Sequence, residues 1–125
     1  MNEIKIKRAY EVAEESDGIR VLVDRMWLRG ISKDKLKTEK WIKELAPSVE
    51  LRKWFDHDPN KFDDFCRKYG QELEVNEEAN RFCIQCKEWL KDQNVTFIFA
   101  AKNLDCNNAV ALKMWVEDNI RSECC

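Results

Sequence analysis

Residues 20–30 read RVLVDRMWLRG, an apolar run that changes abruptly into charged residues. The run at 21–23 predicts a short buried strand, because consecutive apolar and mostly β-branched residues are typical of strands covered on both faces. In α/β sheets the loop that follows such a strand is where ligands bind. In this chain that loop supplies an acid, two arginines and a tryptophan: Asp24, Arg25, Arg29 and Trp27.

Arg25 and Arg29 indicate an anion-binding role for this loop. Arginine carries a fixed fork of N–H donors that matches a carboxylate or a phosphate, and two arginines lie close together here. The alternative is that Asp24 and Arg25 form a structural ion pair at the strand end and that Arg29 is solvated. Trp27 lies in the same loop, outside the helix stripes, so we expect it to wall a pocket.

The composition predicts a folded domain. The chain has 125 residues, 37% of them charged, and a net charge of −2, which weighs against nucleic acid as a partner. We expect one domain over residues 1–121 and a frayed tail at 122–125. No apolar run approaches membrane-spanning length and no signal-peptide core is apparent, so no membrane partner and a cytoplasmic location are expected, with the six cysteines reduced.

The order of elements predicts a helix-rich α/β domain with a small, at least partly parallel sheet covered by helices. Residues 4–10 alternate apolar and basic as a half-covered strand does, and residues 95–101 form a nearly continuous β-forming run. The first two strands are separated by too few residues for a helical crossover. A hairpin is therefore expected, the alternative being a parallel pair joined by an extended loop.

Helices are expected from about residue 41 to residue 90 and again over 109–121. Pro47 ends the first of them, whose apolar stripe begins at Trp41, while residues 30–36 are expected to form a loop. The side chains of Ser48, Asp58 and Asn76 are predicted to cap the helices that follow them, since their oxygens can accept hydrogen bonds from free amides.

Two buried strands, ending at Asp24 and Ala101, each lead into a polar loop. If these strands are parallel neighbours, their carboxyl ends and the start of the last helix meet in one crevice, where the helix adds free amides and a partial positive charge. We therefore predict a site for a small phosphate- or carboxylate-bearing ligand there. The expected ligand-binding residues are Arg25, Trp27, Arg29, Lys102, Asn107 and Asn108.

Asp24 and Cys106 are the candidate catalytic residues if the site supports a reaction of hydrolase or transferase type. Cys106 precedes a helix and lies near Lys102, and both features favour a reactive thiolate. The alternative is that this thiol packs beneath its loop, because no histidine partner is evident. Cys83 and Cys86 match C-x-x-C but fall on an apolar helix stripe, so core packing is expected. No metal or other cofactor is predicted, since no second ligand pair is apparent.

His57 is the only histidine of the chain. Its neighbours Asp56 and Asp58 favour the charged form of the ring, which suits proton transfer. The alternative is a structural turn in which Asp58 caps a helix and His57 bonds to the backbone.

Two alternatives use other parts of the chain. The segment 29–43 carries six basic residues against two acids and, with Trp27 and Trp41, suggests a nucleic-acid- or protein-binding module. The acidic overall charge and the absence of a helix-turn-helix signal weigh against this alternative. The other is a homo-oligomer whose tryptophans form a subunit interface.

Several segments along the chain together form a recognisable set of motifs: IKIKRAY (4–10), RVLVDRMWLRGISK (20–33), ELAPS (44–48), LRKWF (51–55), HDP (57–59) and AAK (100–102) with NNA (107–109). On these motifs, nearly the whole chain resembles the YeaO-like family of small prokaryotic proteins. The family motif at the strand exit is similar to Asp-Arg-Leu-Trp-Pro-Arg-Gly, and the chain departs from it at Leu28, where proline is usual. The later motif is similar to Ala-Lys-Asp, two variable residues, then His-Asn; here Asn103 replaces the acid and Cys106 the histidine. The resemblance implies the fold class rather than a reaction.

Overall fold

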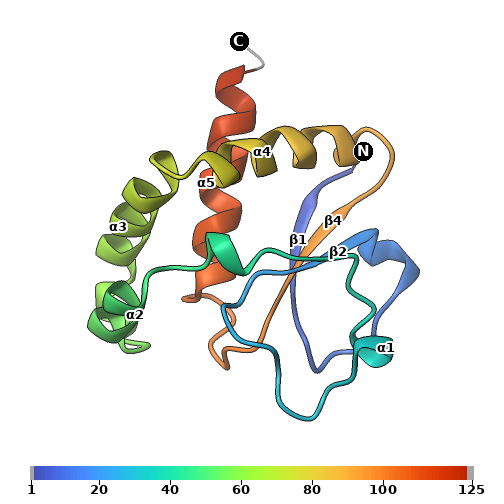
Figure 1. Cartoon of the computed structure of the whole chain (residues 1–125), viewed down its shortest axis with the longest axis horizontal. Helices are drawn as coiled ribbons and strands as arrows, with labels where there is room; N and C mark the ends of the chain where they lie inside the picture. Colours follow the sequence, from blue (N-terminus) through green and yellow to red (C-terminus); the bar gives the residue numbers. More distant parts are fainter. Residues whose placement is uncertain (1, 124–125) are drawn as a thin grey trace.

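The computed structural model describes residues 2–123 and contains one parallel sheet with helices packed over it (Figure 1). The helix-rich α/β class is therefore confirmed. The sheet has the strand order β1-β4-β2-β3. Its strands are β1 (Ile4–Arg8), β2 (Ile19–Leu22), β3 (Lys40–Trp41) and β4 (Val95–Phe99). The α-helices are α1 (Lys33–Leu36), α2 (Val49–Phe55), α3 (Phe62–Glu74), α4 (Glu77–Leu90) and α5 (Asn108–Glu123), and the 3-10 turns are η1 (Glu15–Asp17), η2 (Lys43–Leu45) and η3 (Pro59–Lys61).

The expected hairpin of the first two strands is wrong, because β4 lies between β1 and β2 and is parallel to both. All five residues of β4 are buried, and the centre of a sheet is the place that covers such a strand on every side. The chain reaches β2 through η1 and a turn at Gly18, whose φ is +65°. A Cβ at this position would lie 2.0 Å from the carbonyl oxygen of Asn94, so the turn requires glycine.

One face of the sheet is covered by α4 and α5, and α2 joins this helical layer through its contact with α3. Val21 and Val23 of the β2 segment and Phe97 and Phe99 of β4 point into this main core. The helix α5 packs against β1 and β4, and α3 packs on both α4 and α5. Cys83 and Cys86 are buried in the same core, and burial raises the pKa of the latter well above its ordinary value. The predicted packing role of these two cysteines is confirmed.

The other face of the sheet has no long helix over it among the described residues and is covered by the segment 27–41. Leu22 and Ile98 lie beneath Trp27 and Trp41, whose rings meet edge to face with centroids 5.4 Å apart. Trp41 belongs to β3 and pairs with Leu22, so the helix expected to begin there is wrong and is reduced to η2. Residues 30–36 likewise contain α1, which Ser32 caps.

The predicted caps at Ser48, Asp58 and Asn76 are confirmed, each accepting a hydrogen bond from an amide of the following turn. The helix α5 continues to Glu123 and so includes two residues of the tail that was expected to fray. Residues 124–125 lie outside the described residues. Within residues 2–123, no helix combines the length and the apolar character needed to cross a membrane.

A buried network of ion pairs covers one end of the sheet face that lacks long helices. The side chains of Asp17 and Arg20 are 1% and 4% exposed and are paired with each other, and Lys7 contacts the same carboxylate at 3.1 Å. Arg20 also donates to the carbonyl oxygen of Leu36, and Thr96 donates to that of Asp17. Burial by itself raises the pKa of Asp17, but hydrogen bonds from the Glu14 amide, Lys7 and Arg20 outweigh it and hold this pKa below its usual value.

We predict that Asp17→Asn lowers the free energy of unfolding by about 3–5 kcal/mol, because it leaves a buried arginine without its counter-charge. The loss should shrink on acidification below pH 3.8, since the parent gives up the same stabilisation as this carboxyl is protonated. Urea unfolding across pH measures both effects. Asp64→Asn removes an exposed ion pair on α3 and should change stability by less than about 1 kcal/mol. Equal losses for the two variants would contradict a structural role for the network.

Candidate functional site

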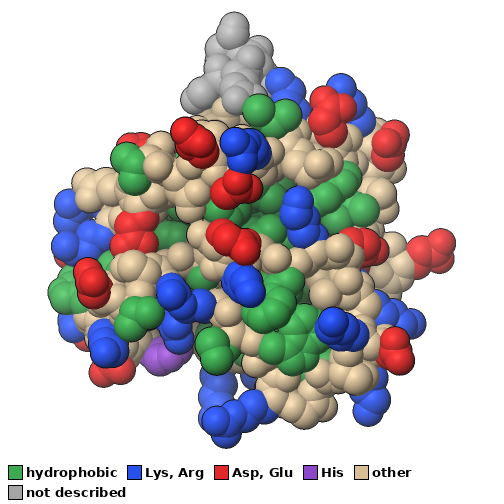
Figure 2. Space-filling view, viewed as in Figure 1, with side chains coloured by type: hydrophobic (Ala, Val, Ile, Leu, Met, Phe, Trp, Pro, Cys, Tyr) green, Lys and Arg blue, Asp and Glu red, His purple; other side chains and the backbone are tan. Residues whose placement is uncertain are grey.

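A cleft of about 920 Å³ opens at the carboxyl ends of β2 and β4. Most of its lining comes from three segments: the exit loop of β2 (24–29), α2 with the turn after it, and the loop that joins β4 to α5. The only histidine of the chain lines the cleft, and Figure 2 shows lysine and arginine side chains on the surface near this histidine, together with an acidic one. The two strand ends therefore meet in one hollow, as the parallel arrangement predicts.

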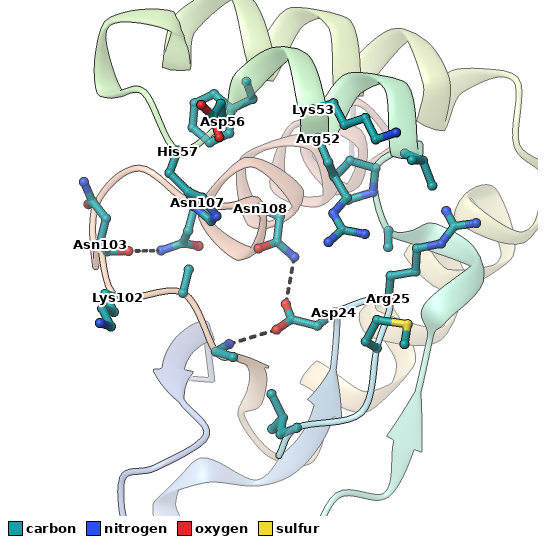
Figure 3. Close-up of a pocket in the computed structure, with 18 of the residues that line it drawn as sticks. Asp24, Arg25, Arg52, Lys53, Asp56, His57, Lys102, Asn103, Asn107 and Asn108 are labelled. Atoms are coloured by element: carbon teal, nitrogen blue, oxygen red, sulfur yellow. Dashed lines mark hydrogen bonds between the residues drawn. The ribbon is translucent and has the colours of Figure 1, made fainter.

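Asp24 joins the ends of the two strands. Its Oδ2 accepts a hydrogen bond from the Ala100 amide at 2.9 Å, and its Oδ1 accepts one from Asn108 Nδ2 at 3.0 Å (Figure 3). The carbonyl oxygen of the same residue accepts a hydrogen bond from Trp41 Nε1 at 2.8 Å. The structure shows no ion pair between Asp24 and Arg25, so the structural interpretation of these residues as a pair is wrong. The carboxylate instead holds β4 and α5 against the end of β2.

The Asp24 carboxyl has a pKa above its ordinary value. Burial raises this pKa and outweighs the hydrogen bonds from Asn108 and Ala100 and the positive charge of Arg52, all of which lower it. Figure 3 shows Arg52 directed from α2 toward this carboxyl. The site therefore contains a carboxyl that is easier to protonate than a solvated one.

The loop between β4 and α5 is fixed by its own asparagines. Asn107 is buried, its Oδ1 accepts a hydrogen bond from the Val110 amide, and its Nδ2 donates to the carbonyl oxygen of Asn103. Asn103 Oδ1 accepts hydrogen bonds from the backbone amides of residues 105 and 106 in the same loop. Asn107 is thus the cap of α5, and Asn108 is the residue that reaches Asp24.

Arg8 holds the end of β4 from the other side. Its Nε and Nη2 donate to the carbonyl oxygens of Ala101 and Ala100, at 3.0 and 3.2 Å. The guanidinium also lies over the ring of Tyr10, which lines the cleft. These bonds fix the backbone that presents the Ala100 amide to Asp24.

Five cationic side chains that line the cleft are exposed and have no salt bridge or side-chain hydrogen bond to any described residue. They are Arg25, Arg29, Arg52, Lys53 and Lys102. Three of them, Arg25, Arg29 and Lys102, are residues that the sequence predicts for the site, and the structure brings them into the same cleft as Trp27. Among residues 2–123, only two carboxylates, those of Asp24 and Asp56, line the same space.

Sequence reasoning missed Arg52 and Lys53, which reach the cleft through the packing of α2. Ser48 donates to Glu72 of α3 at 2.7 Å, and the ring of Phe55 stacks on that of Phe65 with centroids 4.3 Å apart. These contacts turn the exposed side of α2 toward the strand ends. The family-like segment LRKWF (51–55) contains both residues and is the signal that could have indicated them.

His57 lines the cleft, although the sequence left open whether it is structural. Asp56 and His57 have φ values of 47° and 56°, so two successive residues without a glycine adopt the left-handed conformation. Such strained positions are often found at functional sites. The turn that ends α2 therefore also lines the cleft.

Cys106 does not line the cleft. Its thiol is half-buried and lies near enough to Cys66 of α3 to contribute, after burial and Asp63, to raising the pKa of that thiol to about 11. A nucleophile in this place does not face a ligand bound at the strand ends. Over residues 2–123, no group of three or more His, Cys, Asp or Glu side chains is arranged to hold a metal ion.

We predict that Asp24→Asn lowers the free energy of unfolding by about 1–3 kcal/mol. The two oxygens of Asp24 accept hydrogen bonds from two donors, and in the variant an NH₂ group replaces one of these oxygens, so one donor loses its acceptor. Folding raises the pKa of this carboxyl, so the folded chain takes up the proton first as the pH falls. The parent should therefore gain stability over the variant between the raised pKa and the ordinary value of 3.8.

Urea unfolding of both proteins through this pH range measures the difference. Asp105→Asn, in the same region but exposed, is the control and should change the free energy of unfolding by less than about 0.5 kcal/mol. A difference that shrinks on acidification would contradict the assigned environment of Asp24.

Comparison with known proteins places the chain among small bacterial proteins. It is 40% identical over 113 residues to the uncharacterized protein YeaO of Escherichia coli (strain K12), which covers 90% of this chain and 96% of that protein. It is 47% identical over 70 residues to the uncharacterized proteins Rv3073c of Mycobacterium tuberculosis and Mb3100c of Mycobacterium bovis, covering 56% of this chain and 59% of each relative. No solved structure matches it.

The family model for DUF488-N3i, described as the inactive DUF488-N3 subclade, matches residues 3–124. This match spans almost the whole chain, and the similarity to YeaO spans almost the whole of that relative. The chain therefore belongs to the DUF488-N3i family of YeaO-like proteins, as the resemblance of its motifs predicts.

Proposed function

We propose that this chain binds a small anionic ligand in the cleft at its strand ends and carries out no reaction on it. The observation that supports binding is the set of five exposed cationic side chains around the cleft, none of which has an acidic partner within hydrogen-bonding reach among the described residues. Cations that surround a concave site raise the local concentration of anions and speed their association. The start of α5 adds a partial positive charge at the same place.

Several observations favour binding without catalysis. Both oxygens of Asp24 already accept structural hydrogen bonds, and Cys106 lies outside the cleft. The family-like motif of the β4–α5 loop has Asn103 and Cys106 in place of an acid and a histidine. The description of the family as an inactive subclade agrees with this proposal.

The basic segment 29–43 supports a nucleic-acid-binding function less well. Lys40 and Lys43 lie over the rings of Trp89 and Trp41, with the ammonium nitrogens 6.0 and 5.1 Å from the ring centroids. Arg29 lines the cleft. The basic residues of this segment are therefore divided among different surroundings rather than gathered in one stripe.

We predict that Arg25→Ala and Arg52→Ala each weaken the binding of inorganic phosphate by roughly tenfold to a hundredfold, the effect of losing a charged hydrogen bond. Their melting temperatures should change by less than about 3 °C, because both side chains are exposed and unpaired. Isothermal titration calorimetry and thermal unfolding measure the two quantities.

Arg67→Ala removes an exposed arginine of α3 outside the cleft and serves as the control, with binding unchanged. A parent chain that binds neither phosphate, sulfate nor a simple carboxylate would refute the proposed function. So would equal weakening by the control variant.

A further inference from the structure

The cations that Figure 3 labels lie at two ends of the cleft. Arg25, Arg52 and Lys53 lie toward one end, and Lys102 lies at the other, on the side of His57. The hydrogen-bonded pair of Asp24 and Asn108 lies between them. Figure 3 shows Lys102 apart from the other three labelled cations, so the two cationic ends are separate in space.

The middle of the cleft does not suit a negative charge. Asp24 presents a carboxyl there, and an anion placed against it meets repulsion whenever that group is ionised. The lining of the cleft also includes the buried side chains of Leu28, Pro47, Phe55 and Phe65. A neutral, largely apolar part of a ligand fits this middle, and anionic parts fit the ends.

The volume of the cleft suits an organic molecule better than an inorganic ion. Pockets for organic molecules commonly enclose about 300–1,000 Å³, and this cleft, at about 920 Å³, lies in that range. An inorganic ion bound at one end would leave the apolar walls in water and the cation of the other end unpaired.

We infer that the cleft takes an organic dianion whose two anionic groups are held apart by a neutral, mainly apolar chain or ring. Arg25 and Arg52 bind one anionic group and Lys102 binds the other, with the body of the ligand between them. This inference rests on the proposed function and names the ligand class of the same site. Two linked groups bind more tightly than either alone only when the link spans both subsites, so the affinity depends on length.

The test is a calorimetric titration of the full chain with the linear dicarboxylates from succinate through suberate, each compared with the monocarboxylate of equal carbon number. One dicarboxylate of the series should bind at least roughly tenfold more tightly than its monocarboxylate, with weaker binding of shorter and longer members. Lys102→Gln should weaken binding of that dicarboxylate at least roughly tenfold more than it weakens binding of the monocarboxylate. Arg52→Gln should weaken both kinds of ligand.

Lys33→Gln is the matched control, because this lysine is exposed on α1 and does not line the cleft. It should change neither affinity, and circular dichroism should show all variants folded. The dianionic ligand class is refuted if each dicarboxylate binds as tightly as its monocarboxylate, or if Lys102→Gln weakens both equally. Either result would leave the proposed anion binding intact. If phosphate and every carboxylate fail to bind the parent chain, the proposed function fails as well.

Discussion

The carboxylate of Asp24 is shared between the end of β4 and the first turn of α5, while its own residue follows β2. This sharing is possible only because β2 and β4 are neighbours and parallel, so their carboxyl ends lie at one edge of the sheet. Arg8 fixes the same stretch of β4 from the side of β1. The position of Lys102, the cation on the β4–α5 side of the cleft, therefore depends on these few hydrogen bonds.

The two faces of the sheet are closed by different means, and the difference leaves the strand ends open. Long helices bury one face in an apolar core, whereas an irregular segment and an ion network around Asp17 and Arg20 cover the other. Since α2 is held to α3 by Ser48 and Glu72, it stands opposite the strand ends rather than over them. The result is a cleft whose lining combines buried apolar side chains with exposed, charged ones.

Local chemistry made much of this predictable from the sequence. Strands and helix caps depend on patterns that span only a few residues, so a single sequence can reveal them. Examples are the apolar runs that form β2 and β4 and the capping side chains of Ser48 and Asn76. The predicted site was conditional on the strands that end at Asp24 and Ala101 being parallel neighbours, and the pairing of β2 with β4 meets that condition. The hairpin failed because loop length alone does not say that a later strand, β4, enters between the first two.

The remaining part of the site depends on packing between distant segments. A helix pattern shows that Arg52 is exposed, but only the docking of α2 on α3 shows which hollow it faces. Similarly, the turn around Asn103 Oδ1 sets the direction of the loop that carries Cys106, and the sequence suggested only that the thiol lies near Lys102. Tertiary contacts decided both outcomes.

An amide NMR titration of the chain with adipate would locate a bound anion residue by residue. Binding at the strand ends predicts that the largest shift changes fall in residues 24–29, 52–57 and 100–108, three segments that are distant in sequence and share the cleft. Shift changes confined to residues 33–43, or spread evenly over the exposed lysines, would contradict a ligand site built on the two strand ends.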